Sequence, residues 1–198
     1  MASFKLTQGI SRVPEDVFVE DGMTVTSGGL TVTAGGVTVT AGTTTLGGSL
    51  VRDLVTLTAD TTITQADHAG RILLMGEVGG DASATFTLPA ATGSGDEYKF
   101  IVSVVNTSNY VIKVADATDT IDGSVVVTND SSAGGTASLI SWPTVAASDT
   151  ITLDGTTTGG AQIGDYVLLT DIATNQYTVS GLLNASGTEA TPFSATVS

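Results

Sequence analysis

The chain has 198 residues, with 20 acidic and 6 basic side chains, a formal net charge of −14 and no cysteine. This charge opposes binding to phosphate backbones and anionic membrane surfaces, and the missing cysteine excludes disulfides and thiolate chemistry. Neither an export signal nor an apolar run of about 18 residues is present, so we expect a protein kept in a cytoplasm, with no nucleic-acid or membrane partner.

Residues 1–22 are predicted to form an extended arm around Pro14. Phe4 and Leu6 alternate as in a strand, and an arm with two early apolar anchors either docks on a partner or becomes an edge strand of the same molecule. Both alternatives stay open. The side chains that we select as candidate partner contacts are Phe4, Leu6, Ile10, Val17 and Phe18.

A seven-residue phrase then occurs three times in residues 23–43, as MTVTSGG, LTVTAGG and VTVTAGT, and TTLGG echoes it in residues 44–48. Threonine and valine with paired glycines disfavour a helix, so each unit is predicted to be a short strand and a turn. Four residues of strand span only about 13 Å and cannot bury a hydrophobic face alone. Each unit must therefore stack on other units or on other chains.

This region also lacks any charge between Gly22 and Val51. An exposed β-prone segment without charges aggregates unless its edges are paired. We therefore predict a β-stalk over residues 23–50, intertwined in a homotrimer, with a flat meander packed on the main domain as the alternative. The predicted oligomerisation residues are Met23, Val25, Leu30, Val32, Val37, Val39 and Leu46.

Residues 51–198 show longer strand patterns separated by turn signals, among them Asp122-Gly123. Many short strands at this spacing predict an all-β domain, namely a β-sandwich or jelly-roll-like fold, with a barrel as a further possibility. The predicted strands are 54–58, 71–75, 84–88, 98–105, 110–114, 124–128, 138–142, 150–153, 166–170 and 177–179.

One short helical turn is expected within this domain. Thr64 and Asp67 have the spacing of a capping box, and Gly70 is placed to end the turn. The single histidine, His68, falls inside it and is interpreted as a capping or surface residue, because no second histidine or cysteine accompanies it.

No residue is assigned a catalytic, cofactor-binding or metal-binding role. Asp116, Asp119 and Asp122 have a spacing that would suit calcium, but aspartates are also common in turns. Asp96 and Glu97 are adjacent, so their carboxylates are expected to diverge rather than act as a glycosidase pair. Trp142 is interpreted as a core plug or a sheet-end cap.

The acidic side chains are unevenly distributed. Beyond Lys113 no basic residue occurs, so the acids of residues 114–198 are unopposed. We expect an acidic exterior there, suited to a neutral or basic partner.

Three stretches of this domain resemble a group of structural proteins from tailed bacteriophages. The residues that carry the resemblance are DTTIT and GRILL (60–64 and 70–74), TFTLPAATG (85–93) with TIDG (120–123), and DTITLDGTTTGG (149–160) with GTEATPFSAT (187–196). The resemblance implies a β-domain of the virion, in a head decoration (cement) protein or a tail fibre, and implies no catalytic residue.

From these observations we expect a non-enzymatic decoration protein that trimerises and stabilises a head by bridging subunits of a major capsid protein. It would be assembled in the host cytoplasm and sit on the outer surface of the capsid, where the arm side chains would be the capsid contacts. The alternative is a short tail fibre or spike for host attachment. A polysaccharide-cleaving spike is a third hypothesis.

Overall fold

The computed structural model describes residues 37, 39, 44–45, 47–78, 83–104, 109–129 and 138–197. The chain divides into two compact units, Met1–Ser49 and Leu50–Ser198. The second unit contains every described strand and is nearly all β, which confirms the predicted all-β class.

Each of the ten predicted ranges overlaps a strand. Two further strands, β2 and β12, have only two residues each, too few for an alternating pattern to reveal. The described strands are β1 Leu54–Leu57, β2 Thr61–Thr62, β3 Ile72–Met75, β4 Ala84–Thr87, β5 Glu97–Val102, β6 Tyr110–Lys113, β7 Thr120–Asn129, β8 Leu139–Pro143, β9 Thr150–Leu153, β10 Tyr166–Ala173, β11 Gln176–Ala185 and β12 Phe193–Ser194.

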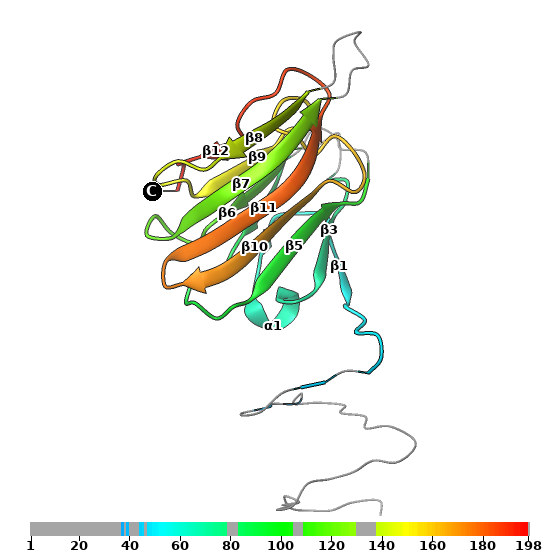
Figure 1. Cartoon of the computed structure of the whole chain (residues 1–198), viewed down its shortest axis with the longest axis vertical. Helices are drawn as coiled ribbons and strands as arrows, with labels where there is room; N and C mark the ends of the chain where they lie inside the picture. The colour runs from blue at the N-terminus through cyan, green and yellow to red at the C-terminus, as the bar shows by residue number, and fades with distance from the viewer. Residues whose placement is uncertain are drawn as a thin grey trace, which may run out of the picture. The chain divides into compact units, whose positions relative to one another are not determined.

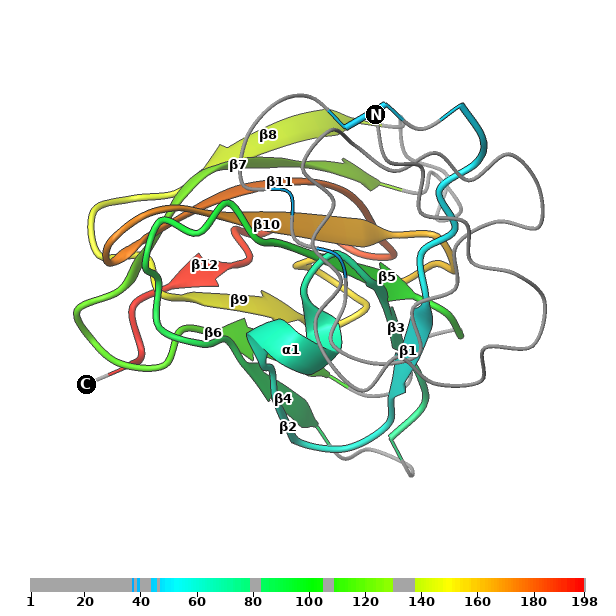
Figure 2. The same ribbon diagram turned by 90° about the horizontal axis from the view of Figure 1, so that it is seen from below.

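These strands form two sheets. The larger has seven strands in the order β1-β3-β5-β10-β11-β7-β8, and the smaller has five in the order β12-β9-β6-β4-β2. Figure 1 looks onto the seven-stranded sheet, and Figure 2 shows the two sheets as separate layers.

The first six strands alternate between the sheets. Strands two apart in the chain therefore pair in parallel, β1 with β3 and β3 with β5 in the large sheet, β2 with β4 and β4 with β6 in the small one. This connectivity differs from the antiparallel Greek keys of a jelly roll. The sequence could not specify it, because alternation shows which face a residue occupies but not which strand lies beside it.

One hydrophobic core lies between the sheets. Phe86 of β4 stacks on Phe100 of β5, with ring centroids 5.8 Å apart, and on Tyr110 of β6 at 6.1 Å. The Tyr110 hydroxyl donates to the Gly76 carbonyl at 2.8 Å, which satisfies its buried polar atom. The aromatic contact joins β4 of one sheet to β5 of the other, while valine, isoleucine and leucine supply most of the remaining core.

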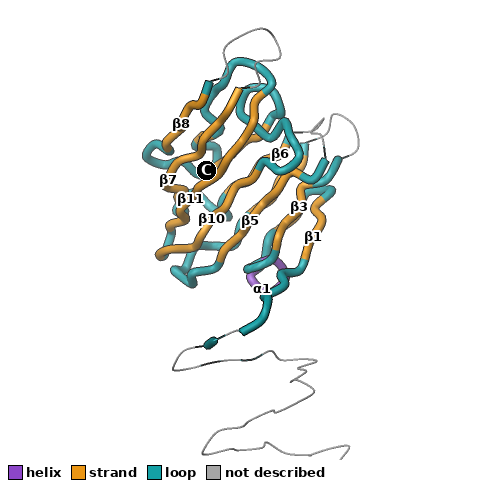
Figure 3. Tube along the Cα trace, turned by 45° about the vertical axis from the view of Figure 1, so that its right-hand side comes forward, coloured by secondary structure: helices purple, strands orange, loops and turns teal. Residues whose placement is uncertain are grey.

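The predicted helical turn is present as α1, Gln65–His68. Thr64 caps it by accepting a hydrogen bond from the Asp67 N–H at 3.2 Å, and Gly70 ends it with φ +71°. The His68 Nδ1 accepts from the Thr64 N–H at 3.0 Å, so this buried histidine is a capping residue. Figure 3 shows α1 at the end of the large sheet where β3 begins.

Strands β7 and β11 are longer than predicted, since they pair in parallel along ten residues. The prediction of a turn at Asp122-Gly123 was wrong, because both residues lie inside β7. Gly123 has φ +143°, and a Cβ there would lie 2.2 Å from the Val179 carbonyl oxygen. Glycine at this position thus permits close approach of two strands rather than a change of direction.

Candidate assembly interface

The outer face of the seven-stranded sheet carries two adjacent rows of side chains aligned across all seven strands. The first row is Thr56, Leu74, Ile101, Tyr166, Leu182, Val126 and Ser141. The second row is Leu54, Ile72, Lys99, Leu168, Ser180, Ser124 and Pro143. We call these two rows the apolar belt.

In its first row the belt has a large apolar side chain on each of five strands that are neighbours in the sheet, namely β3, β5, β10, β11 and β7. Leu54 is 64% exposed and Leu182 is 44% exposed, while the other large apolar members are half-buried. Soluble monomers seldom expose a large contiguous apolar patch, and such patches often mark interaction sites. The belt therefore has the character of an interaction surface.

Charge is almost absent from the belt. Lys99 is its single charged residue, and the ammonium lies 4.8 Å from the centroid of the Tyr166 ring, whose face stabilises it. The acids Glu97 and Asp122 occupy the adjacent row, and Glu97 forms an ion pair with Arg52 at 3.4 Å. A chain of net charge −14 thus keeps two aligned rows free of carboxylates.

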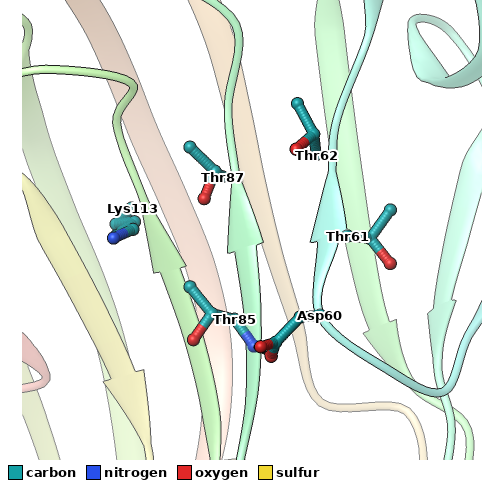
Figure 4. A pocket seen from close by; sticks show the side chains of 6 residues that line it. All are labelled: Asp60, Thr61, Thr62, Thr85, Thr87 and Lys113. Atoms are coloured by element: carbon teal, nitrogen blue, oxygen red, sulfur yellow. The ribbon is translucent and has the colours of Figure 1, made fainter.

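A polar hollow of about 340 Å³ lies on β2, β4 and β6 of the other sheet (Figure 4). The Asp60 carboxylate accepts a hydrogen bond from the Thr85 N–H at 2.8 Å. One oxygen of that carboxylate therefore serves the backbone of β4. The residues that line the hollow are Asp60, Thr61, Thr62, Thr85, Thr87 and Lys113.

The buried Asp171 of β10 holds the loop that follows β4. Its carboxylate accepts hydrogen bonds from the N–H groups of Thr92, Gly93 and Ser94 at 2.6–3.2 Å, and from the hydroxyls of Thr92 and Ser94. Burial alone would raise the pKa of Asp171, but these hydrogen bonds outweigh it and lower the pKa.

Three further carboxylates hold backbone in the same way. Asp149 accepts from the N–H groups of residues 196 and 197, Asp154 from those of 156–158, and Asp165 from those of 162 and 184. Composition suggested an acidic exterior for residues 114–198, yet Asp149, Asp165 and Asp171 are buried. Part of the acidic charge therefore fixes loops instead of facing a partner.

Acid should weaken the fold through Asp154. Burial would raise the pKa of this carboxyl, but hydrogen bonds from the Thr157 hydroxyl and three backbone N–H groups lower it from 3.8 to about 2. Because the folded-state pKa lies below the unfolded-state value, this stabilisation is complete above about pH 4 and is lost as the pH falls toward 2. We expect Asp154→Asn to lose less stability than the wild type between pH 5 and 2.5, measured by urea unfolding. Equal losses in both proteins would contradict this role.

The aspartates considered for calcium do not converge. Asp116 is exposed and accepts from the Thr118 N–H at 2.8 Å, as in an ordinary turn, and Asp122 accepts from the Gln176 side-chain amide at 2.9 Å. Asp119 is 1% exposed; burial raises its pKa, and its Oδ1 has no hydrogen-bond partner among the described residues. Within that part of the chain no three His, Asp or Glu residues are placed to hold a metal ion.

The other singled-out residues have structural partners. Asp96 accepts from the Gln65 side chain at 2.6 Å, whereas Glu97 pairs with Arg52, so the two carboxylates serve different contacts. Trp142 packs against the hydrophobic core, as its interpretation as a core plug requires.

Most predicted interface residues lie outside the described residues. Val37 and Val39 are described, and both are exposed, at 69% and 54%. The belt, by contrast, was not anticipated; unbroken apolar runs such as Ile72–Met75 were its only sequence signal, because they place apolar residues on both faces of a strand. Outside the described residues lie Phe4, Leu6, Ile10, Val17, Phe18, Met23, Val25, Leu30, Val32 and Leu46.

Comparison with protein-family models, curated proteins and solved structures finds no match for this chain. Among the described residues, no helix has the length and apolar character needed to cross a membrane. The function must therefore be argued from the surfaces of the molecule.

Proposed function

We propose that this chain is a non-enzymatic structural protein of a phage virion, a capsid decoration protein that forms a homotrimer on the outer surface of the head. In this proposal the two sheets form a sandwich, residues 23–50 form the trimeric stalk, and residues 1–22 reach the major capsid protein. The observation that carries the proposal is the apolar belt, a partly exposed surface without carboxylates that suits assembly.

The chemistry of the described residues supports an assembly role. The carboxylates of Asp149, Asp154, Asp165 and Asp171 are engaged by backbone N–H groups, which makes them structural. Rigid loops lower the entropy cost of forming an interface. A trimer that bridges several capsid subunits adds stability through multivalency even when each contact is weak.

Removing residues 1–22 should strongly weaken capsid binding while leaving the trimer intact, because the arm is the proposed capsid contact. Losing the arms should weaken binding by about a hundredfold or more, since three linked contacts reinforce one another. Co-sedimentation with purified capsids measures the binding, and sedimentation velocity checks the oligomer. A second variant, which replaces Phe4, Leu6 and Phe18 with serine in the full-length chain, should lose binding in the same way. Undiminished binding by both variants would contradict the assignment of the arm.

The second candidate is a short tail fibre or spike, and the polar hollow favours it. Threonine hydroxyls beside one carboxylate and one ammonium offer the hydrogen-bonding groups that host glycans require. Copy number discriminates the two, because a decoration protein is abundant on each virion whereas a fibre is present in a few copies at the tail.

A further inference from the structure

The apolar belt could pack against another copy of this chain or against a different partner. The distribution of charge on the chain favours another copy. Identical copies of a chain with net charge −14 repel one another unless the surfaces that meet lack acids. Both rows of the belt meet this condition, because they contain no carboxylate and a single lysine, whose ammonium lies over the Tyr166 ring. A basic partner would instead favour the acid-bearing surfaces of the chain.

The remaining polar members of the belt also suit a packed contact. Thr56, Ser124, Ser141 and Ser180 are small, neutral and exposed, so they can approach another surface closely without burying a charge. The large apolar side chains lie between β1 and β7, on central strands of the sheet and on the edge strand β1. Contact over this face would bury apolar area across several strands at once.

Chain connectivity favours a copy of the same chain. Leu54, at the start of β1, follows Leu46, the last predicted oligomerisation residue, by eight positions, a tether of at most about 29 Å. Chains joined by the proposed stalk would hold their belts at a high effective concentration for one another. This step rests on the proposed trimer.

We propose that the apolar belt is the surface through which the β-domains of neighbouring copies pack in the trimer. It is then distinct from the capsid contact, which the arm provides. The Leu54 and Leu182 side chains, exposed in a single chain, become buried between copies.

Thiol labelling of single-cysteine variants tests this assignment, since the chain has no cysteine of its own. Leu182→Cys places a thiol in the belt, and the matched control Val145→Cys places one at a residue 68% exposed outside it. In the full-length trimer we expect the belt thiol to react with a maleimide about tenfold more slowly than the control, because thiol reactivity follows exposure. Adding Leu54→Asp and Tyr166→Glu to the belt variant should restore fast labelling.

Each labelling result either supports or overturns packing of the belt between copies. Slow belt labelling in the trimer without capsids, restored by the two substitutions, supports packing between copies. Belt labelling as fast as the control in a verified trimer overturns it. Protection that arises only after capsids are added also overturns it, but leaves the decoration function standing. A full-length chain that is monomeric at every concentration overturns both this inference and the proposed trimer.

Discussion

Asp171→Asn should lower the free energy of unfolding by about 3 kcal/mol. The substitution replaces a buried carboxylate that accepts several hydrogen bonds with an amide, whose NH2 group would face the N–H donors of the loop. The Thr92, Gly93 and Ser94 N–H groups donate to both oxygens of the buried carboxylate, and the amide keeps only one of these oxygens as an acceptor; the three loop residues themselves are exposed. Urea unfolding followed by circular dichroism at neutral pH measures the change.

Asp116→Asn is the matched control for this substitution. Asp116 is also an aspartate bonded to a nearby N–H, that of Thr118, but it is exposed, so water can replace the lost acceptor. The control should unfold close to the wild-type midpoint. If both variants shifted equally, the loop would not depend on the buried carboxylate.

Gly123→Ala should be at least as damaging, with a loss of about 3 kcal/mol or more, because it combines a steric clash with backbone strain. The added Cβ would lie 2.2 Å from the Val179 carbonyl oxygen, and φ at this position is +143°. The parallel pairing of β7 with β11 would have to open. Thermal and urea unfolding would report the loss, and hydrogen exchange in β7 and β11 would locate it.

Gly95→Ala separates the two causes. Gly95 also has a positive φ, of +78°, but nothing lies within 4 Å of the position where its Cβ would be. Strain alone should cost about 1 kcal/mol there. Equal destabilisation by the two variants would show that the close approach of β7 and β11 contributes nothing.

Together these residues explain how a chain with few aromatic residues supports a defined surface. Buried carboxylates such as that of Asp171 hold loops through hydrogen bonds, and glycine at position 123 lets β7 and β11 pack closely. The outer face of the large sheet is therefore presented on strands fixed by their neighbours, which suits a surface meant to pack against another molecule.

Local sequence patterns were enough for the all-β class, for the existence of ten strands and for the capped turn at Thr64–Gly70. These features depend on residues near one another in the chain: β-branched residues favour strands, and a threonine three positions before an aspartate caps a helix. Strand ends were less well predicted where Asp122-Gly123 resembled a turn.

Tertiary structure alone decided which strands are neighbours, which carboxylates are buried and where the apolar belt lies. Asp171 and the loop at residues 92–94 are far apart in sequence, and the belt joins residues from Leu54 to Leu182. Hydrophobic alternation assigns a residue to a face but carries no record of its cross-strand partner. A surface made by register across seven strands therefore becomes visible only when the sheet is assembled.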